Sequence, residues 1–241
     1  MSKIITVFGA TGNQGGSVID SLLSDPVVTA EYKVRGVTRD TSKPTSQRLA
    51  SRGVEMVPVC VSPFLSEFLQ HNRPSPDDDD RIADVGSQAD MGSADDTARA
   101  VAGSHTVFFV TNYWEHMSRE KEVGQGKMVA DACKKAGVKH VIFSSLIDVT
   151  KATKGRLPHV EHFDGKAEIE QYIRDSGVQG TFVMPGFFMS NFFGTIKKGA
   201  DGKYTFSLPV SGSKAQIPMF DSGKDTGKHA LENCTRLEPA S

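Results

Sequence analysis

Apolar residues along the chain recur at two spacings, one typical of buried strands and the other typical of helices. Residues 3–8 form a short run rich in β-branched side chains that ends at Gly9. Residues 16–24 then place apolar side chains three and four positions apart, which is the spacing of one helix face. The pattern therefore predicts a strand, a glycine-rich turn and a helix.

The same order repeats through most of the chain. Further strands are predicted at residues 32–38, 54–57, 106–111, 139–144 and 180–184. Further helices are predicted at residues 45–52, 95–102, 118–136 and 164–175. Strands that alternate with helices form a parallel sheet covered on both faces, because right-handed crossovers place the helices there. We therefore expect an α/β fold, a doubly wound parallel sheet of the Rossmann type, over residues 1–184.

Two segments depart from this alternation. Residues 58–87 contain several prolines and the acidic run Asp77 to Asp80, with no strand or helix period longer than a few residues. We expect an exposed, disordered insertion there. Residues 185–241 are rich in Gly, Phe, Lys and Ser and include short extended pieces such as residues 203–208. We interpret them as a small lobe on the substrate side of the sheet.

Charge and cysteine content exclude several classes of protein. Among 241 residues, 28 Lys and Arg nearly balance 29 Asp and Glu, so we expect no direct binding of nucleic acid. Cys60, Cys133 and Cys234 are too scattered for a disulfide framework or a zinc site. His159 and His162 have no third ligand in view, so we expect no metal. No apolar stretch is long enough to span a membrane, and we expect a cytoplasmic protein, with the nucleus as the alternative.

The glycine-rich turn contains the strongest chemical signal. It follows a strand and opens a helix, the context in which such a turn binds the pyrophosphate of a dinucleotide at the helix N-terminus. Its first glycine permits the tight turn, its second admits the pyrophosphate, and its third lets helix and strand pack closely. The alternative is a glycine-rich turn that binds nothing. The residues expected at the cofactor are Gly9, Ala10, Thr11, Gly12, Asn13, Gln14 and Gly15.

The end of the second predicted strand indicates which dinucleotide is bound. NAD-selective proteins usually place a carboxylate there to accept from the ribose 2′-hydroxyl, whereas this chain has Arg39, with Lys43 four residues on. A guanidinium can pair with a 2′-phosphate through two parallel hydrogen bonds. The pattern therefore favours NADP(H). The alternative is that Arg39 is a solvated loop residue and Asp40 holds the ribose.

These features, with Thr-Asn-Tyr-Trp-Glu at residues 111–115 and His-Phe-Asp-Gly-Lys at residues 162–166, resemble the NmrA-like family of atypical short-chain dehydrogenases. The resemblance covers residues 3–57 and 89–227. It implies an NADP-binding protein. Some members of that family sense the redox state of the cofactor and regulate transcription or enzymes, and others reduce quinones, dyes or phenolic substrates.

The resemblance assigns further residues to the cofactor site. It implies that Asp90 lies near the adenine and that Lys166 reaches the nicotinamide ribose. Thr111, Asn112 and Tyr113 would line the crevice at the end of the fourth strand. A wall beside the nicotinamide would be formed by Phe188, Met189, Ser190 and Asn191. Without the resemblance, Tyr113 and Phe188 would be interpreted as ordinary core residues.

Catalysis has weaker support than binding. Working short-chain dehydrogenases use Tyr-x-x-x-Lys, in which the lysine lowers the tyrosine pKa, but here His162 stands in the tyrosine's place before Lys166. A histidine can pass protons near neutral pH, so these two residues are the catalytic candidates. We interpret the chain as a sensor of the redox cofactor with little or no turnover, acting on a protein partner such as a transcription factor or a metabolic enzyme. The alternative is an NADPH-dependent oxidoreductase whose small-molecule substrate is a quinone or a conjugated carbonyl.

Two further departures bear on this interpretation. Joining Val57 to Gln88 would restore the sequence pattern of the family, so residues 58–87 are extra. They represent either translated intron sequence or a lineage-specific loop. Family members also continue beyond the position of Ser241, so we expect a truncated substrate-side lobe. Such a lobe would leave apolar surface exposed near residues 187–193, which predicts poor solubility, a partner or weak substrate selection.

Overall fold

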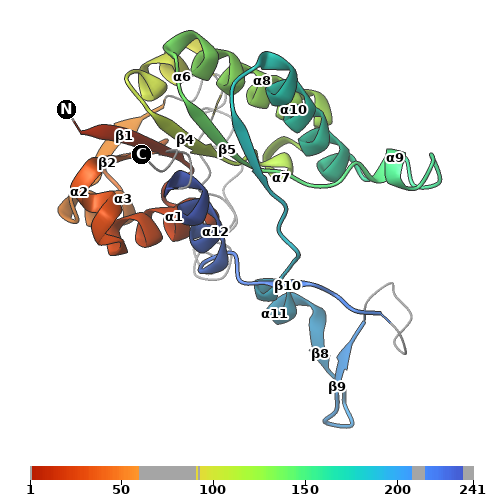
Figure 1. Cartoon of the computed structure of the whole chain (residues 1–241). Coiled ribbons are helices and arrows are strands. Elements are labelled where there is room, and N and C mark those ends of the chain that lie inside the picture. The colour runs from red at the N-terminus through yellow and green to blue at the C-terminus, as the bar shows by residue number, and fades with distance from the viewer. Residues whose placement is uncertain (1, 60–90, 92, 208–214, 236–241) are drawn as a thin grey trace, which may run out of the picture.

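The core of the chain is a six-stranded parallel sheet, seen in a computed structural model that describes residues 2–59, 91, 93–207 and 215–235 (Figure 1). The strands are β1 (Lys3–Phe8), β2 (Tyr32–Thr38), β3 (Glu55–Pro58), β4 (Thr106–Phe109), β5 (His140–Ser144) and β6 (Gly180–Val183). Their order is β3-β2-β1-β4-β5-β6, and every pairing is parallel. The Rossmann-type doubly wound sheet predicted from the sequence is therefore confirmed. Its strand order reverses between β1 and β4, the place where such sheets bind ligands.

Helices cover both faces of the sheet. They are α1 (Asn13–Ser24), α2 (Pro26–Glu31), α3 (Pro44–Ser51), α6 (Ala94–Val101), α7 (Tyr113–His116), α8 (Arg119–Ala136), α9 (Val149–Ala152), α10 (Glu161–Ser176) and α12 (Asp225–Thr235). Phe109 and Phe143 pack with α8 and α10 on one face, whereas Phe108 packs with α1 and α12 on the other. This position explains why three apolar residues follow Thr106 in β4. A strand that is buried on both faces needs apolar side chains on both.

The ends of the predicted segments shift by a few residues, for physical reasons. The first helix begins at Asn13 rather than residue 16, because the extended Gly12 is its N-cap and helical backbone starts directly after it. The short helix α2 was not predicted. Pro26 suits its first position, and Asp25 Oδ1 accepts from the backbone N–H groups of Val27 (2.8 Å) and Val28 (3.0 Å).

The first two residues of the predicted insertion belong to the edge of the sheet. Pro58 pairs with Thr38 at the end of β3, and Val59 is buried and donates its N–H to the Thr38 carbonyl at 3.0 Å. A proline is tolerated at this place because β3 is an edge strand, so the expected disorder is wrong for residues 58 and 59. Residues 60–87 lie outside the described part of the chain.

A small lobe follows β6 and extends away from the sheet (Figure 1). It consists of β7 (Phe187–Phe188), the 3-10 turn η2 (Met189–Asn191), α11 (Phe192–Thr195), β8 (Ile196–Lys198), β9 (Tyr204–Phe206) and β10 (Met219–Phe220). β7 pairs with β10 in parallel, and β8 pairs with β9 as a hairpin. Phe193 is 93% exposed, which agrees with the apolar surface expected near residues 187–193.

The last described helix returns to the six-stranded sheet. Although α12 lies beyond the predicted domain boundary at residue 184, it packs along α1. The backbone N–H of Gly227 donates to Ser17 Oγ at 3.0 Å, and Ala230 and Cys234 are buried against the same face. No helix in the described part of the chain is both long and apolar enough to cross a membrane.

Candidate functional site

The candidate site begins at the turn between β1 and α1. Gly9 has φ of +68°, a backbone conformation that side chains disfavour, and the N–H of Gly12 donates to the Gly9 carbonyl at 2.9 Å. A Cβ added at Gly15 would lie 2.1 Å from the Gly9 carbonyl oxygen. The third glycine therefore has the predicted role, because only a residue without a side chain lets α1 approach β1 this closely.

The N-terminus of α1 is left open to a ligand. Gly12 is its N-cap and has no side-chain hydrogen bond, and the first turn contains no acidic residue. Gln14 Oε1 is buried and has no hydrogen-bond partner among the described residues. Free backbone N–H groups and the helix dipole together favour an anion at this end. The turn thus fits the pyrophosphate of a dinucleotide.

Arg39, Asp40 and Lys43 follow β2 on the same edge of the sheet. Arg39 is partly buried, and its Nη1 lies 2.9 Å from Glu115 Oε1. Asp40 Oδ1 accepts from the backbone N–H and the hydroxyl of Ser42 at 2.8 and 2.6 Å, and these bonds hold the pKa of Asp40 below its usual value. Lys43 is exposed at the N-terminus of α3. One oxygen of the Asp40 carboxylate is therefore engaged within its own turn, as the Arg39 guanidinium is engaged by Glu115.

A buried ion pair lies at the end of β4. Lys166 Nζ, from α10, donates to the Thr111 carbonyl at 3.1 Å and to Glu122 Oε1, and Thr111 Oγ1 donates to the same carboxylate oxygen at 2.7 Å. Glu122 belongs to α8, and its side chain is 1% exposed. Burial lowers the pKa of Lys166, whereas the charge of Glu122 opposes that shift. The structure therefore brings together the predicted residues Thr111 and Lys166 and adds a carboxylate between them.

The second oxygen of that carboxylate is confined. Glu122 Oε2 is buried without a hydrogen-bond partner in the described part of the chain, and a Cβ at Gly165 would lie 2.9 Å from it. Sequence reasoning missed Glu122. A signal was present, because Glu122 lies four residues before the buried Gly126 and shares its apolar face of α8, where a charged residue is unusual.

Aromatic rings pack beside this ion pair. The His162 ring lies 5.7 Å from that of Tyr113 and 5.0 Å from that of Trp114. Burial, and then the charge of Lys166, lower the pKa of His162. The Tyr113 hydroxyl donates to Glu161 Oε2 at 3.1 Å, and burial followed by this hydrogen bond raises the pKa of Tyr113. The pKa of Tyr113 is thus shifted in the direction opposite to that of a phenol activated by a lysine.

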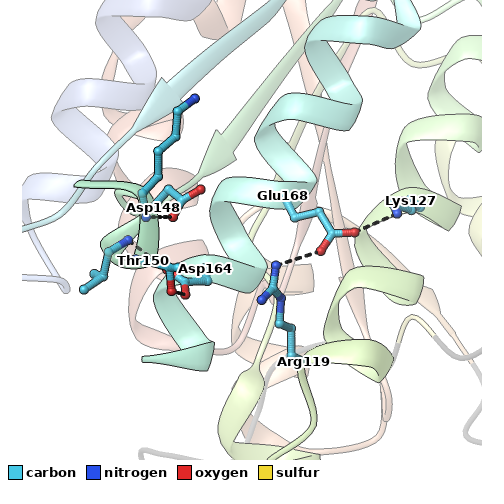
Figure 2. A network of polar contacts seen from close by, with 8 residues as sticks. Arg119, Lys127, Asp148, Thr150, Asp164 and Glu168 are labelled. Carbon is cyan, nitrogen blue, oxygen red and sulfur yellow. Dashed lines mark hydrogen bonds and ion pairs between the residues drawn. The ribbon is translucent and has the colours of Figure 1, made fainter. Parts of the chain in front are cut away.

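Two polar networks hold α10, and with it Lys166, in place (Figure 2). Asp164 is buried and accepts from the backbone N–H groups of Val149 and Thr150 at 2.8 and 3.2 Å, which ties α10 to α9. One turn further along, Glu168 lies between Arg119 (3.1 Å) and Lys127 (2.9 Å), both from α8. These contacts restrict both sliding and rotation of α10, and they thereby fix the position of the Lys166 backbone.

The other residues predicted for the cofactor site do not contact Lys166 in the described part of the chain. Phe188 packs against Phe220 with ring centroids 6.2 Å apart, and Met189, Ser190 and Asn191 are exposed in the lobe. Among the described residues, no hydrogen bond or ring contact joins these four to Lys166. Asn112 caps α7 without a side-chain bond. Asp90 lies outside the described residues, and the stretches that are described contain no group of three metal-ligating side chains.

The fold and this edge of the sheet define an α/β protein of the Rossmann type with a glycine-rich turn at a helix N-terminus that has no side-chain cap. The chain belongs to the NmrA-like family, whose model matches residues 1–238. Its relatives include NmrA-like family domain-containing oxidoreductases, among them ptmS of Penicillium ochrochloron, 30% identical over 244 residues, and malD of Malbranchea aurantiaca, 31% identical over 241 residues. Each alignment covers 93% of this chain and 62% of the relative.

Solved structures give the same fold. The transcriptional regulator NmrA in complex with NADP superposes with a TM-score of 0.69 at 22% identity, over 97% of this chain and 62% of that one. NmrA has also been solved with NAD, with a TM-score of 0.70 at 22% identity over the same shares of the two chains. The NADPH-dependent quinone oxidoreductase QOR2 of Escherichia coli superposes with a TM-score of 0.53 at 22% identity, over 80% of this chain and 51% of that one. This chain spans about three fifths of the length of ptmS, malD and NmrA, and about half that of QOR2.

Proposed function

We propose that this chain binds NADP(H) along the carboxyl edge of its sheet. The observation on which the proposal rests is the open N-terminus of α1, where the glycine turn leaves backbone donors without a side-chain cap. The NADP, NAD and NADPH complexes of structural neighbours support the same class of ligand. When bound, the group would supply a nicotinamide that accepts or gives a hydride.

Each part of the cofactor has residues suited to it. Residues 9–15 would hold the pyrophosphate, and Arg39 with Lys43 would hold the 2′-phosphate. Thr111, Asn112, Tyr113 and Lys166 would surround the nicotinamide ribose. The family resemblance adds Asp90 near the adenine and residues 188–191 beside the nicotinamide. The partly buried position of Arg39 supports NADP(H) over NAD(H), because a guanidinium that is partly shielded from water binds a phosphate more strongly.

Titration of the chain with NADP⁺ and NAD⁺ by calorimetry tests this proposal. We expect tighter binding of NADP⁺ than of NAD⁺. We expect Arg39→Ala to lower the affinity for NADP⁺ by roughly 10- to 100-fold while the affinity for NAD⁺ changes little. Arg52→Ala is the matched control, since Arg52 forms an exposed ion pair with Asp20 at 2.6 Å. Binding of neither dinucleotide by the wild type, or an unchanged ratio in Arg39→Ala, would contradict the proposal.

We also propose that the bound cofactor is sensed rather than turned over. Lys166 is held by Glu122 and the Thr111 carbonyl, and the nearby Tyr113 has a raised pKa. Neither arrangement supplies the activated phenol that reduction of a carbonyl needs. The exposed apolar side chains of the lobe, led by Phe193, support a protein partner such as a transcription factor or a metabolic enzyme.

Reduction of a quinone or a conjugated carbonyl is the second candidate. It is favoured by the names of the fungal relatives, which are oxidoreductases, and by the position of His162, a residue type able to exchange protons, one turn before Lys166 on α10. NADPH oxidation with a panel of quinones separates the two candidates. Steady turnover that disappears in Lys166→Ala, but persists in the exposed control Lys134→Ala, would overturn the sensor.

A further inference from the structure

Arg39, the proposed 2′-phosphate residue, is already paired with a carboxylate. Its Nη1 lies 2.9 Å from Glu115 Oε1 across a separation of 76 residues. The two side chains are only 24% and 16% exposed, so the pair is largely shielded from water. Screening by salt is correspondingly weak, and the charge of Glu115 acts on anything that approaches this guanidinium.

Glu115 is held in this position by the short helix to which it belongs. α7 is fixed on the far side by the Tyr113 hydroxyl, which donates to Glu161 at 3.1 Å, and by Trp114, whose ring packs 5.0 Å from that of His162. Met117 ends α7 with φ of +47°, and its N–H donates to the Tyr113 carbonyl at 2.7 Å. Because these contacts anchor α7, the helix cannot readily carry Glu115 away from Arg39.

The two dinucleotides differ in how they meet this pair. A 2′-phosphate carries roughly −1.5 to −2 charges near pH 7 and seeks the guanidinium that Glu115 already neutralises. It would lie near a carboxylate of the same sign in a partly dry environment. A 2′-hydroxyl is neutral and can itself donate to a carboxylate. The pair therefore lowers the affinity for NADP(H) and has little effect on the affinity for NAD(H).

We propose that Glu115 is a specificity-determining residue, which competes with the 2′-phosphate for Arg39 and so restrains the preference of the chain for NADP(H) over NAD(H). This inference rests on the proposed binding of a dinucleotide at the same edge. It differs from the assignment of Arg39, because it concerns a residue expected to reduce affinity for the preferred cofactor.

The test is Glu115→Gln, which removes the charge and nearly preserves the shape. We expect the ratio of NADP⁺ to NAD⁺ affinity to rise roughly tenfold, mainly through tighter NADP⁺. The same change should appear with adenosine 2′,5′-bisphosphate against AMP, which isolates the 2′-phosphate. Glu55→Gln is the matched control, since it removes the same charge from an ion pair with Arg35, which lies at 3.1 Å on β2, the strand that leads to Arg39. A smaller variant, Glu115→Ser, should shift the ratio in the same direction.

The outcomes separate this inference from the proposed function. If the wild type binds neither dinucleotide, the proposed function fails, and this inference fails with it. If the wild type binds but both Glu115 variants leave the ratio unchanged or lower it, the inference alone is overturned. It is also overturned if NADP⁺ and NAD⁺ weaken equally, because Glu115 would then contact a part that the two share.

Discussion

Gly15 and Gly16 are neighbours in the first turn of α1, but their surroundings differ. A Cβ at Gly15 would lie 2.1 Å from the Gly9 carbonyl oxygen, whereas a Cβ at Gly16 would come no closer than 3.7 Å to the Ala10 carbonyl oxygen. The first contact is with backbone that cannot move without opening the turn. We therefore expect Gly15→Ala to lower the free energy of unfolding by about 1–3 kcal/mol and to weaken dinucleotide binding.

Gly16→Ala is the internal control for that prediction. It places a methyl group in ordinary contact within a helix, where alanine is favoured over glycine by up to about 1 kcal/mol. Urea unfolding of the two variants should therefore move in opposite directions. Equal effects would show that the close packing of α1 on β1 does not determine the need for glycine at residue 15.

Lys166 shows what a single residue's environment adds to a motif. The His-Phe-Asp-Gly-Lys pattern indicated a lysine near the cofactor, but not the charge next to it. Glu122 supplies that charge from another helix, and Gly165 leaves room for its second oxygen. Such a pair is costly to bury and is stable only when both partners are present. The pattern thus predicted a location, and packing decided the chemistry.

At the scale of elements, the position of α1 depends on a helix near the end of the described chain. α12 packs along α1 through Gly227, where an added Cβ would lie 2.0 Å from the Ser17 carbonyl oxygen and 2.3 Å from Ser21 Oγ. We expect Gly227→Ala to push α12 away, to cost about 2 kcal/mol or more in unfolding free energy, and to loosen the turn. Hydrogen exchange of α1 and α12 would measure this locally.

Gly223→Ala serves as the control for that experiment. Gly223 is exposed, and an added Cβ would meet only Asp221 Oδ1, at an ordinary 3.5 Å. Its unfolding free energy should change by no more than about 0.5 kcal/mol. If Gly227→Ala behaves in the same way, the contact between α1 and α12 is not the constraint that we infer from the geometry.

At the scale of the whole molecule, acid stability should reflect a buried histidine at the start of β5, an inner strand of the sheet. His140 in β5 is fully buried, and burial, followed by the charge of His105, lowers its pKa from 6.5 to about 4. The unfolded chain therefore takes up this proton first as pH falls. Stability is full above about pH 6.5 and decreases toward pH 4, by roughly 2–3 kcal/mol from this residue.

The variant His140→Gln tests that assignment. A glutamine amide can keep the contact with Thr181 Oγ1, now 2.9 Å from His140 Nε2, but it cannot titrate. Its unfolding free energy, measured in urea between pH 7 and 4.5, should fall less steeply than that of the wild type. His159→Gln, at an exposed position, should leave the slope unchanged. Parallel slopes for all three proteins would contradict the prediction.

The lobe and the sheet also differ at this scale. The sheet buries its apolar side chains on two faces, whereas the lobe leaves Phe193 and Tyr204 93% and 69% exposed. An apolar surface of this kind is typical of an interface. The proposed partner of the sensor would therefore meet the lobe, while the cofactor would meet the edge of the sheet.

The sequence alone determined the alternation of strands and helices, the turn at residues 9–15 and the positions of Arg39 and Lys166. These features depend on local periods and on the backbone freedom of glycine, so they can be recognised within short windows. The tertiary structure decided that Arg39 pairs with Glu115 and that Gly227 packs on Ser17, across 76 and 210 residues. Such pairs depend on which strands become neighbours and which faces pack, and no local pattern contains that information.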